Sequence, residues 1–214
     1  MSNLKTKLKT KLNILTYPNP LLREVSLPVK KFDQELKNLV KDMLETMYDA
    51  NGIGLAAPQV GQLLRLLVID TRPKLSEKDL EDSRYENDAQ TELESKIKQP
   101  LVLINPEIIK GHGKTTFDEG CLSVPSFFET VERFDEVEVK AFDIDGKEFR
   151  FKTDGLLAIC IQHEMDHLEG TLFIDHISFT KSNKIKNQIK KNGYPTKEEL
   201  AEKKAERKKA LTKS

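Results

Sequence analysis

A chain of 214 residues is long enough for one domain with a sizeable core, or for one domain with appendages. Its 35 basic and 35 acidic side chains give a net charge of zero, which excludes a general electrostatic attraction of the whole molecule to nucleic acid. Because the N-terminus lacks the apolar segment of a secretory signal, and no apolar run reaches the roughly 18 residues that cross a bilayer, we expect a cytoplasmic protein that does not enter a membrane.

The N-terminal part of the chain predicts a basic extension followed by a helix. Residues 1–12 contain lysines and no acidic residue, which indicates a solvated N-terminal extension. From Asp33 to Met47 apolar residues recur at helical spacing, with Asp33 suited to the N-cap and Gly52 just beyond the end. This pattern predicts an amphipathic helix.

Two short apolar runs predict buried strands on either side of an insertion. The first run is Leu64 to Ile69, and the second is Leu101 to Ile104, which we expect to end at Asn105-Pro106. Residues 71–100 are rich in Glu, Asp and Lys and show no lasting apolar periodicity. We therefore expect an exposed acidic insertion over about 71–100, in which one weak helix could form.

The second half predicts a hairpin, a helix and a basic tail. Alternating apolar residues flank an Asp-Gly turn, which predicts a hairpin from Val137 to Phe151. Helical spacing resumes from Asp154 to Leu168. Residues 181–214 contain twelve Lys or Arg and four Glu, and Thr196 with Glu199 forms a potential capping box for a final helix. Strands, a core helix and a tail indicate an α+β fold with a main domain over residues 13–180.

The predicted helix from Asp154 contains the sequence His163-Glu164-Met165-Asp166-His167, an HExxH motif. A four-residue step places both imidazoles on one helix face, about 6 Å apart along the axis, where they can share a metal ion. Glu164 between them would face a water molecule on the metal. The alternative, a chance match in an exposed helix, is less well supported because the chain has only four histidines.

A hydrolytic site of this kind requires a third protein ligand. The metzincin pattern is excluded, because Phe173 occupies the position of its third His. Cys160 would lie about 10 Å from His167 along the helix axis, so we expect it to line a pocket or the core. Cys121 is the remaining soft ligand, although a buried structural thiol would be the ordinary interpretation of a lone Cys.

Three segments resemble, in order and spacing, the signature motifs of peptide deformylases: Gly52 to Gln59, Glu119 to Ser123, and Gln162 to Leu168. The resemblance covers roughly residues 13–178. It departs at the acidic insertion and at Ser126, where many bacterial relatives have Gly. It implies antiparallel β-sheets packed around a central helix that carries HExxH, with an N-terminal amphipathic helix and a C-terminal helical tail.

The same resemblance implies a catalytic mechanism. One divalent metal, usually ferrous iron in bacteria, would be held by Cys121, His163 and His167; a purified sample could contain Zn, Ni or Co in its place. Glu164 would take a proton from a water on the metal and later protonate the departing amine. The Gln59 side-chain amide and the Leu122 backbone N–H would donate to the oxyanion of the intermediate. Without the surrounding motif, Gln59 would be interpreted as a solvated loop residue.

Counting back from His163 by three, four and seven residues predicts an apolar wall for the methionine side chain, formed by Cys160, Ile159 and Leu156. Ordinary helix packing would explain each of these residues alone. By resemblance, Ile53 completes the pocket, and the peptide binds as an added strand along the segment from Gly52 through Gly54 to Leu55 and along Gly120.

Several residues outside the motifs have two interpretations. Arg133 and Asp166 are either a pair that steadies the site or ordinary surface charges. His112 and His176 are expected to be structural or exposed.

The implied substrates are formyl-methionyl nascent peptides, and the basic tail would approach ribosomal RNA near the exit tunnel. We expect a monomer.

Two other functions compete with the deformylase. A metallopeptidase could share HExxH, but a Cys ligand disfavours it. An inactive ribosome-associated binding module is disfavoured because every expected ligand, Glu164 and Gln59 are retained.

Overall fold

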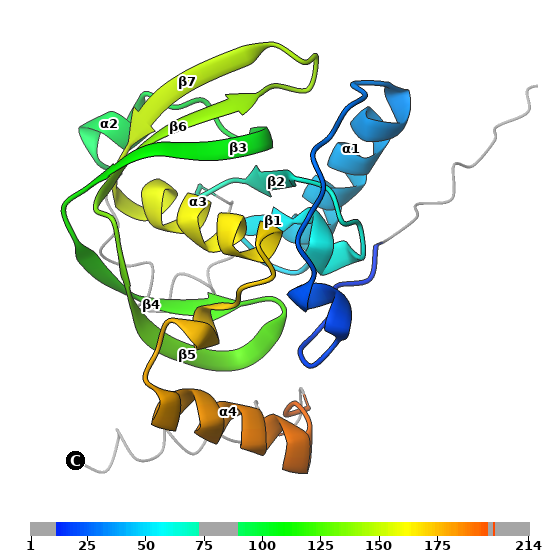
Figure 1. Ribbon diagram of the computed structural model, residues 1–214, viewed down its shortest axis with the longest axis vertical. Coiled ribbons are helices and arrows are strands. Elements are labelled where there is room, and N and C mark those ends of the chain that lie inside the picture. The colour runs from blue at the N-terminus through cyan, green and yellow to red at the C-terminus, as the bar shows by residue number, and fades with distance from the viewer. Residues whose placement is uncertain (1–11, 73–89, 197–198, 200–214) are drawn as a thin grey trace, which may run out of the picture.

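The computed structural model describes residues 12–72, 90–196 and 199. The predicted N-terminal extension therefore lies almost wholly outside the described residues, as do the middle of the acidic insertion and most of the tail beyond Thr196. Within the described residues the chain forms a five-stranded sheet, a separate two-stranded sheet and four α-helices (Figure 1).

The larger sheet has the strand order β1-β2-β3-β6-β7, and each neighbouring pair is antiparallel. Its strands are β1 (Gly54–Ala56), β2 (Leu66–Ile69), β3 (Leu101–His112), β6 (Glu136–Phe142) and β7 (Glu148–Thr153). The hairpin of β6 and β7 confirms the pattern of alternating residues, with Gly146 in the turn at a φ of 81°. β1 lies at the edge of the sheet, so one side of its backbone can pair with an added strand.

The expected end of the second strand at Asn105-Pro106 is wrong, because β3 continues to His112. The ladder between β3 and β6 shifts register between Ile104 and Glu107. Pro106 lies within this irregularity, where its missing N–H interrupts no regular ladder bond. The side chain of Asn105 instead accepts a bond from the Val29 N–H at 2.8 Å.

The second sheet is a hairpin of β4 (Thr115–Cys121) and β5 (Val124–Arg133), which the apolar pattern did not predict. Its residues are mostly polar, so only short stretches show an apolar alternation. In Figure 1 this hairpin lies on one side of α3 (Gly155–Leu168), and the larger sheet lies on the other. The end of β4 is thereby brought to the helix.

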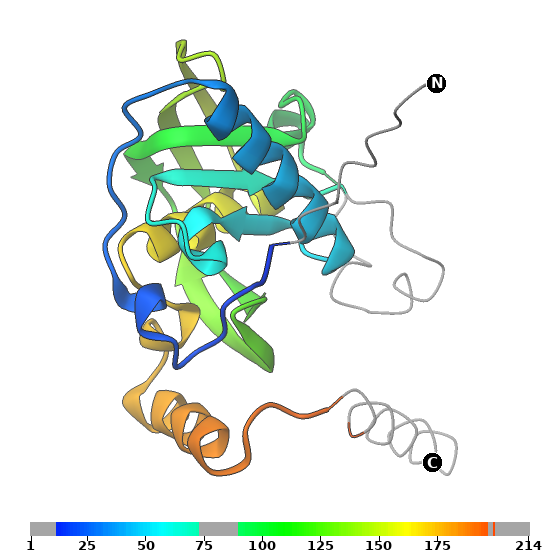
Figure 2. The ribbon, with the colours of Figure 1, turned by 90° about the vertical axis from the view of Figure 1, so that its right-hand side faces the viewer.

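Two helices cover opposite faces of the larger sheet, and β2 shows why. Leu67 and Ile69 pack with α3, whereas Leu66 and Val68 pack with α1 (Gln34–Asp49), because successive strand residues point to opposite faces. Figure 2 shows α1 lying across the sheet on the side away from α3. α1 confirms the predicted helix, and its N-cap Asp33 accepts a bond from the Leu36 N–H at 3.1 Å.

The C-terminal helix α4 (Phe179–Asn192) packs against the β4–β5 hairpin. Its Ile185 and Ile189 are buried in a cluster with Val124, Val131 and Phe173. The remaining short elements are α2 (Glu92–Ser95) and three 3-10 helices, η1 (Pro20–Arg23), η2 (Ala57–Val60) and η3 (Phe173–Asp175).

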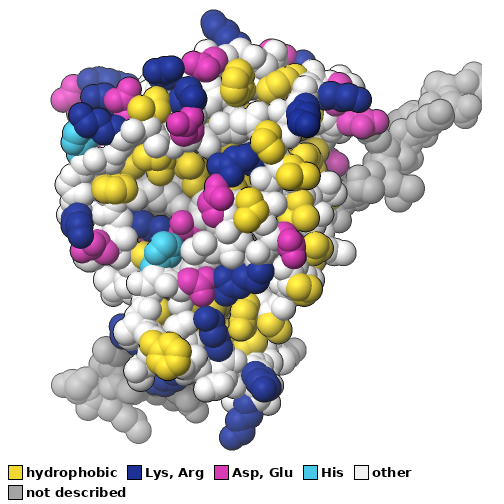
Figure 3. Space-filling model, viewed as in Figure 1, with side chains coloured by type: hydrophobic (Ala, Val, Ile, Leu, Met, Phe, Trp, Pro, Cys, Tyr) yellow, Lys and Arg dark blue, Asp and Glu magenta, His cyan; other side chains and the backbone are white. Residues whose placement is uncertain are grey.

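The predicted capping box is present, since the Glu199 N–H donates to the Thr196 hydroxyl at 3.2 Å and the Thr196 N–H donates to the Glu199 carboxylate at 2.7 Å. On the face shown in Figure 3, basic and acidic side chains are intermixed, and basic side chains gather at the lower end. Among the described residues, no helix has the length and apolar character that crossing a membrane requires. The mixed α and β architecture with antiparallel sheets confirms the predicted fold class.

Candidate metal centre and substrate pocket

Helix α3 holds both histidines of the HExxH motif inside the molecule. His163 and His167 are buried, and their ring centroids lie 5.2 Å apart with an interplanar angle of 75°. One turn of helix separates the two residues, so both rings emerge on the face that meets the β4–β5 hairpin. The helix is buried on nearly every side, which holds the rings in place.

Cys121 reaches the same point from the last position of β4. Its Sγ lies 3.2 Å from His167 Nε2, and one ligand atom from each of Cys121, His163 and His167 lies within 4.8 Å of the other two. A thiolate with two imidazoles suits Zn²⁺, Fe²⁺, Ni²⁺ or Co²⁺. The three residues therefore fit a divalent metal, and the predicted ligands lie together.

A chain of charged groups orients His163 from behind. Glu119 accepts a hydrogen bond from His163 Nδ1 at 2.8 Å, which leaves Nε2 for a metal. Arg133 Nε and Nη2 donate to Glu119 at 2.6 and 2.9 Å, and Arg133 Nη1 donates to Asp166 at 2.7 Å. His176 Nε2 lies 2.7 Å from Asp166 as well. The pair of Arg133 and Asp166 is thus part of the site and not a surface feature.

These contacts shift the pKa values of the buried groups. Burial alone would raise the pKa of Glu119, but the hydrogen bonds from Arg133 and His163 outweigh burial and lower it to about 2. Burial lowers the pKa of His167 well below its usual value, so this imidazole is neutral and has a lone pair for a metal. Burial raises the pKa of the Cys160 thiol well above its usual value, so the thiol stays protonated and unreactive. This suits a residue that lines the substrate pocket.

Glu164 is buried beside the ligands, and its Oε2 has no hydrogen-bond partner. Burial raises the pKa of Glu164 to about 7. A carboxylate with this pKa can take up and release a proton near neutral pH, which is what a general base requires. A nearby cation would lower the value again.

Gln59 belongs to η2, and its side-chain amide is held at both ends. The Ala56 N–H donates to Oε1 at 2.7 Å, so Nε2 points the other way, 3.1 Å from the Ser123 hydroxyl and 3.7 Å from Cys121 Sγ. Gln59 is only 1% exposed, which excludes a solvated loop residue. The amide donor is thereby directed at the candidate metal site.

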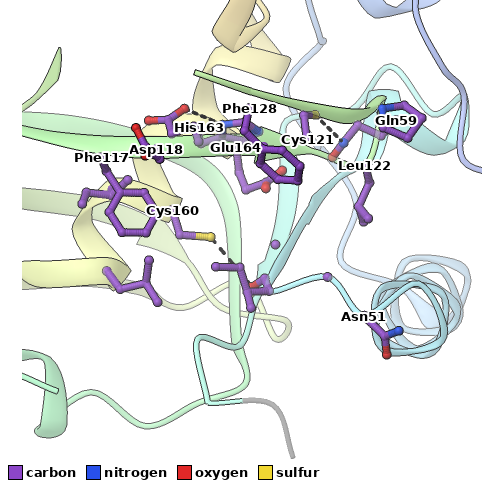
Figure 4. A pocket seen from close by; sticks show the side chains of 18 of the residues that line it. Asn51, Gln59, Phe117, Asp118, Cys121, Leu122, Phe128, Cys160, His163 and Glu164 are labelled. Atoms are coloured by element: carbon purple, nitrogen blue, oxygen red, sulfur yellow. Dashed lines mark hydrogen bonds and ion pairs between the residues drawn. The ribbon is translucent and has the colours of Figure 1, made fainter. Parts of the chain in front are cut away.

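A cavity of about 300 Å³ opens beside these groups. It is lined by all seven residues predicted to bind substrate: Gly52, Ile53, Gly54, Gly120, Leu156, Ile159 and Cys160. Gln59, Cys121, Leu122, His163 and Glu164 also line it, whereas His167 does not. Figure 4 shows Phe117 and Cys160 toward one end of this pocket, with Gln59 and Leu122 toward the other. The cavity has the size of a pocket for an amino-acid side chain with part of a backbone.

Sequence reasoning missed several lining residues, among them Asn51, Phe117, Asp118, Pro125 and Phe128. The β4 strand supplies the signal that could have found Phe117, because it alternates with Glu119 and Cys121 on one strand face. Phe128 has no such local signal, because its position depends on the register of β4 against β5. His112 ends β3 outside the pocket.

Comparisons with known proteins agree with this geometry. A family model described as polypeptide deformylase matches residues 11–183, which include every candidate site residue. The chain is 44% identical to a peptide deformylase of Alkalilimnicola ehrlichii over 84% of this chain and 89% of that protein. It is 48% identical to one of Novosphingobium aromaticivorans over 83% and 95%. A solved peptide deformylase of Legionella pneumophila superposes with a TM-score of 0.69 at 42% identity, covering 84% of this chain and 94% of that one.

Proposed function

The chain belongs to the polypeptide deformylase family, whose members remove the N-formyl group from nascent peptides, and on this premise we propose how its own residues carry out the reaction. The protein is a metal-dependent hydrolase. Water adds to the formyl carbon, the bond between that carbon and the methionine nitrogen breaks, and formate and a free amine leave. The observation that carries the proposal is the convergence of three ligand atoms beside the buried Glu164.

We propose that Cys121, His163 and His167 hold one divalent metal, with Fe²⁺ as the native ion. When bound, this metal would lower the pKa of water and polarise the formyl carbonyl. Glu119 supports this arrangement by holding Nδ1 of His163, which directs the other nitrogen to the ligand cluster.

Glu164 serves as the proton carrier in this proposal. Its unpartnered Oε2 takes a proton from the attacking water and later gives it to the departing amine. The Gln59 amide and the Leu122 backbone N–H donate to the oxygen that becomes negative when water adds. The fixed orientation of the Gln59 amide supports its part, since little reorganisation would be needed during the reaction.

The methionine side chain would bind against Leu156, Ile159 and Cys160 of α3, with Ile53 on the other side. The peptide backbone would lie between the edge strand β1, beside Gly52 and Gly54, and Gly120 of β4. A Cβ atom at Gly54 would come 2.3 Å from Glu164 Oε1, so this position leaves room only for a backbone. The absence of a side chain at Gly54 lets β1 lie close against Glu164 and Cys160 of α3.

The location and assembly of the protein are part of the same proposal. We propose a cytoplasmic monomer that approaches the ribosome near the exit tunnel through its basic C-terminal tail, residues 181–214. Within the described part of that tail, α4 carries the exposed Lys184, Lys190 and Lys191. Seven more basic residues follow Tyr194 in the sequence.

The function can be tested with formyl-Met-Ala and acetyl-Met-Ala as substrates. Protein purified without oxygen and loaded with Fe²⁺ should release formate from the first and leave the second intact, because the small formyl group is the substrate of this family. Metal analysis of the same sample should give about one ion per chain. Equal turnover of the two peptides would instead favour a general metallopeptidase.

A further inference from the structure

We propose that the ring of Phe128 determines specificity for the substrate residue that follows the formyl-methionine, and that it favours a large aromatic side chain there. This inference rests on the proposed function, because it requires a formyl-methionyl peptide in the pocket. Phe128 lines the cavity and is 46% exposed, so its ring is accessible to a peptide bound there.

The Phe128 ring covers the backbone of Gly120. The two residues are direct cross-strand partners in the β4–β5 hairpin, so their side-chain positions share one face of the hairpin. A Cβ atom built on Gly120 would lie 2.3 Å from Phe128 Cε1. The ring therefore occupies the space that a side chain at position 120 would need, directly beside the proposed path of the peptide.

An irregularity in β5 produces this placement. Gly120 pairs with Phe128 whereas the next residue, Cys121, pairs with Val124, so residues 125–127 on β5 have no counterpart on β4. Ser126 lies in this bulge at a φ of 71°, a left-handed conformation that favours Gly. Bulges of this kind redirect side chains next to active sites. Here the bulge ends at Phe128.

Strand alternation indicates which substrate side chain meets the ring. Glu119 and Cys121 point toward α3 and the metal ligands, so Gly120 and Phe128 are on the opposite face of the hairpin. A peptide bound as a strand also alternates. With its methionine directed at the wall of α3, its second side chain points to the face that carries Phe128.

The chemistry of this face favours apolar and aromatic residues over acidic ones. An aromatic pair contributes affinity that corresponds to about a three- to tenfold change in binding. Asp118 lies on the same hairpin face, two residues before Gly120, and lines the same cavity. An acidic second residue would therefore meet a like charge.

The test compares three peptides, formyl-Met-Phe-Ser, formyl-Met-Ala-Ser and formyl-Met-Asp-Ser, by their kcat/KM for formate release. The wild-type enzyme should prefer Phe over Ala by about three- to tenfold, mainly through KM, because binding at this position leaves the bond cleavage unaffected. In Phe128→Ala this ratio should fall to about one, and Phe128→Tyr should keep it. Asp should be the poorest second residue in the wild type.

Phe134→Ala provides a matched control. The Phe134 ring is 45% exposed and covers a glycine, Gly111, but it does not line the cavity. Its loss should leave the ratio of Phe to Ala unchanged. A wild-type ratio near one, or an unchanged ratio in Phe128→Ala, would overturn the inference while the deformylase function stands. Absence of formate release from all three peptides by the wild type would instead contradict the proposed function.

Discussion

Glu164 is buried, and one oxygen of its carboxylate has no hydrogen-bond partner. We predict that Glu164→Gln lowers kcat for formyl-Met-Ala by about 10²- to 10⁴-fold, because the amide cannot accept a proton. Bound metal should remain near one ion per chain, since Glu164 is not assigned as a ligand. Formate release and metal content measured on the same sample check both statements.

Glu169→Gln is the control for this variant. Glu169 caps the end of the same helix and pairs with Arg65 at the surface, 53% exposed, so its loss should leave kcat unchanged. A Glu164→Gln enzyme that works within tenfold of the wild type would remove Glu164 from proton transfer.

The residues of the site differ in how far the sequence could locate them. His163, Glu164 and His167 follow from helical spacing alone, because all three are local to one turn. Cys121 lies more than 40 residues earlier, so it could be chosen only by excluding other ligands and by family resemblance. Glu119 was visible in a motif, but its contacts with His163 and Arg133 required the fold.

At the level of elements, the β4–β5 hairpin is joined to α3 by buried charges. Glu119 on β4, Arg133 on β5 and His163 on α3 meet in one network. The folded pKa of Glu119, about 2, lies below its ordinary value of 4.5. A lowered folded pKa contributes stability that is present above pH 4.5 and lost as pH falls toward 2.

We therefore predict that the unfolding free energy of the wild type falls between pH 4.5 and pH 2, by roughly 3 kcal/mol from this group. Glu119→Gln should already lack most of this stability at pH 7 and should show a flatter decline in the same range. Urea unfolding in the presence of a chelator, so that metal release does not contribute, measures both.

Glu169→Gln again serves as the comparison, because an exposed ion pair contributes about 0–1 kcal/mol. A Glu119→Gln protein with wild-type acid sensitivity would show that the loss of stability at low pH originates elsewhere.

The elements that the sequence predicted share a physical property. α1 and the β6–β7 hairpin have an apolar periodicity, and β2 and α3 are apolar along nearly their whole length; burial imposes both patterns. β4 and β5 lack both, since one face of the hairpin is exposed and the other mixes polar site residues with the buried Val124 and Val131. The chemistry of the site rather than packing determines the polar side chains of this hairpin. The apolar pattern of the sequence therefore did not predict its two strands.

Across the whole molecule, α4 joins the C-terminal segment to the catalytic body. Ile185 and Ile189 are buried under the hairpin, and the Tyr194 hydroxyl donates to the Tyr17 carbonyl at 2.7 Å. We predict that deleting residues 195–214 leaves the melting temperature and formyl-Met-Ala turnover unchanged. Deleting residues 179–214 should lower the unfolding free energy by about 3–6 kcal/mol, because two buried isoleucines are lost. Thermal unfolding of both truncations checks this.

The shorter deletion also tests the ribosome proposal. Combined with Lys→Ala changes at 184, 190 and 191, it removes most basic charge from the tail, so cosedimentation with ribosomes at low salt should fall and lose much of its salt dependence. The shorter deletion alone should have a smaller effect. Wild-type binding by the combined variant would exclude the tail as the docking element.

The close packing around Gly54 limits which substitutions could make this enzyme resistant to an inhibitor. Any side chain at this position would press on Glu164 Oε1 at 2.3 Å and on Cys160 Sγ at 2.8 Å, and relief would require moving the carboxylate or the thiol. A compound anchored to the Gly54 backbone would thus contact a position where a larger residue cannot be introduced without displacing Glu164 or Cys160 and so disturbing catalysis. Escape from such a compound would have to arise elsewhere, and drug design could exploit that constraint.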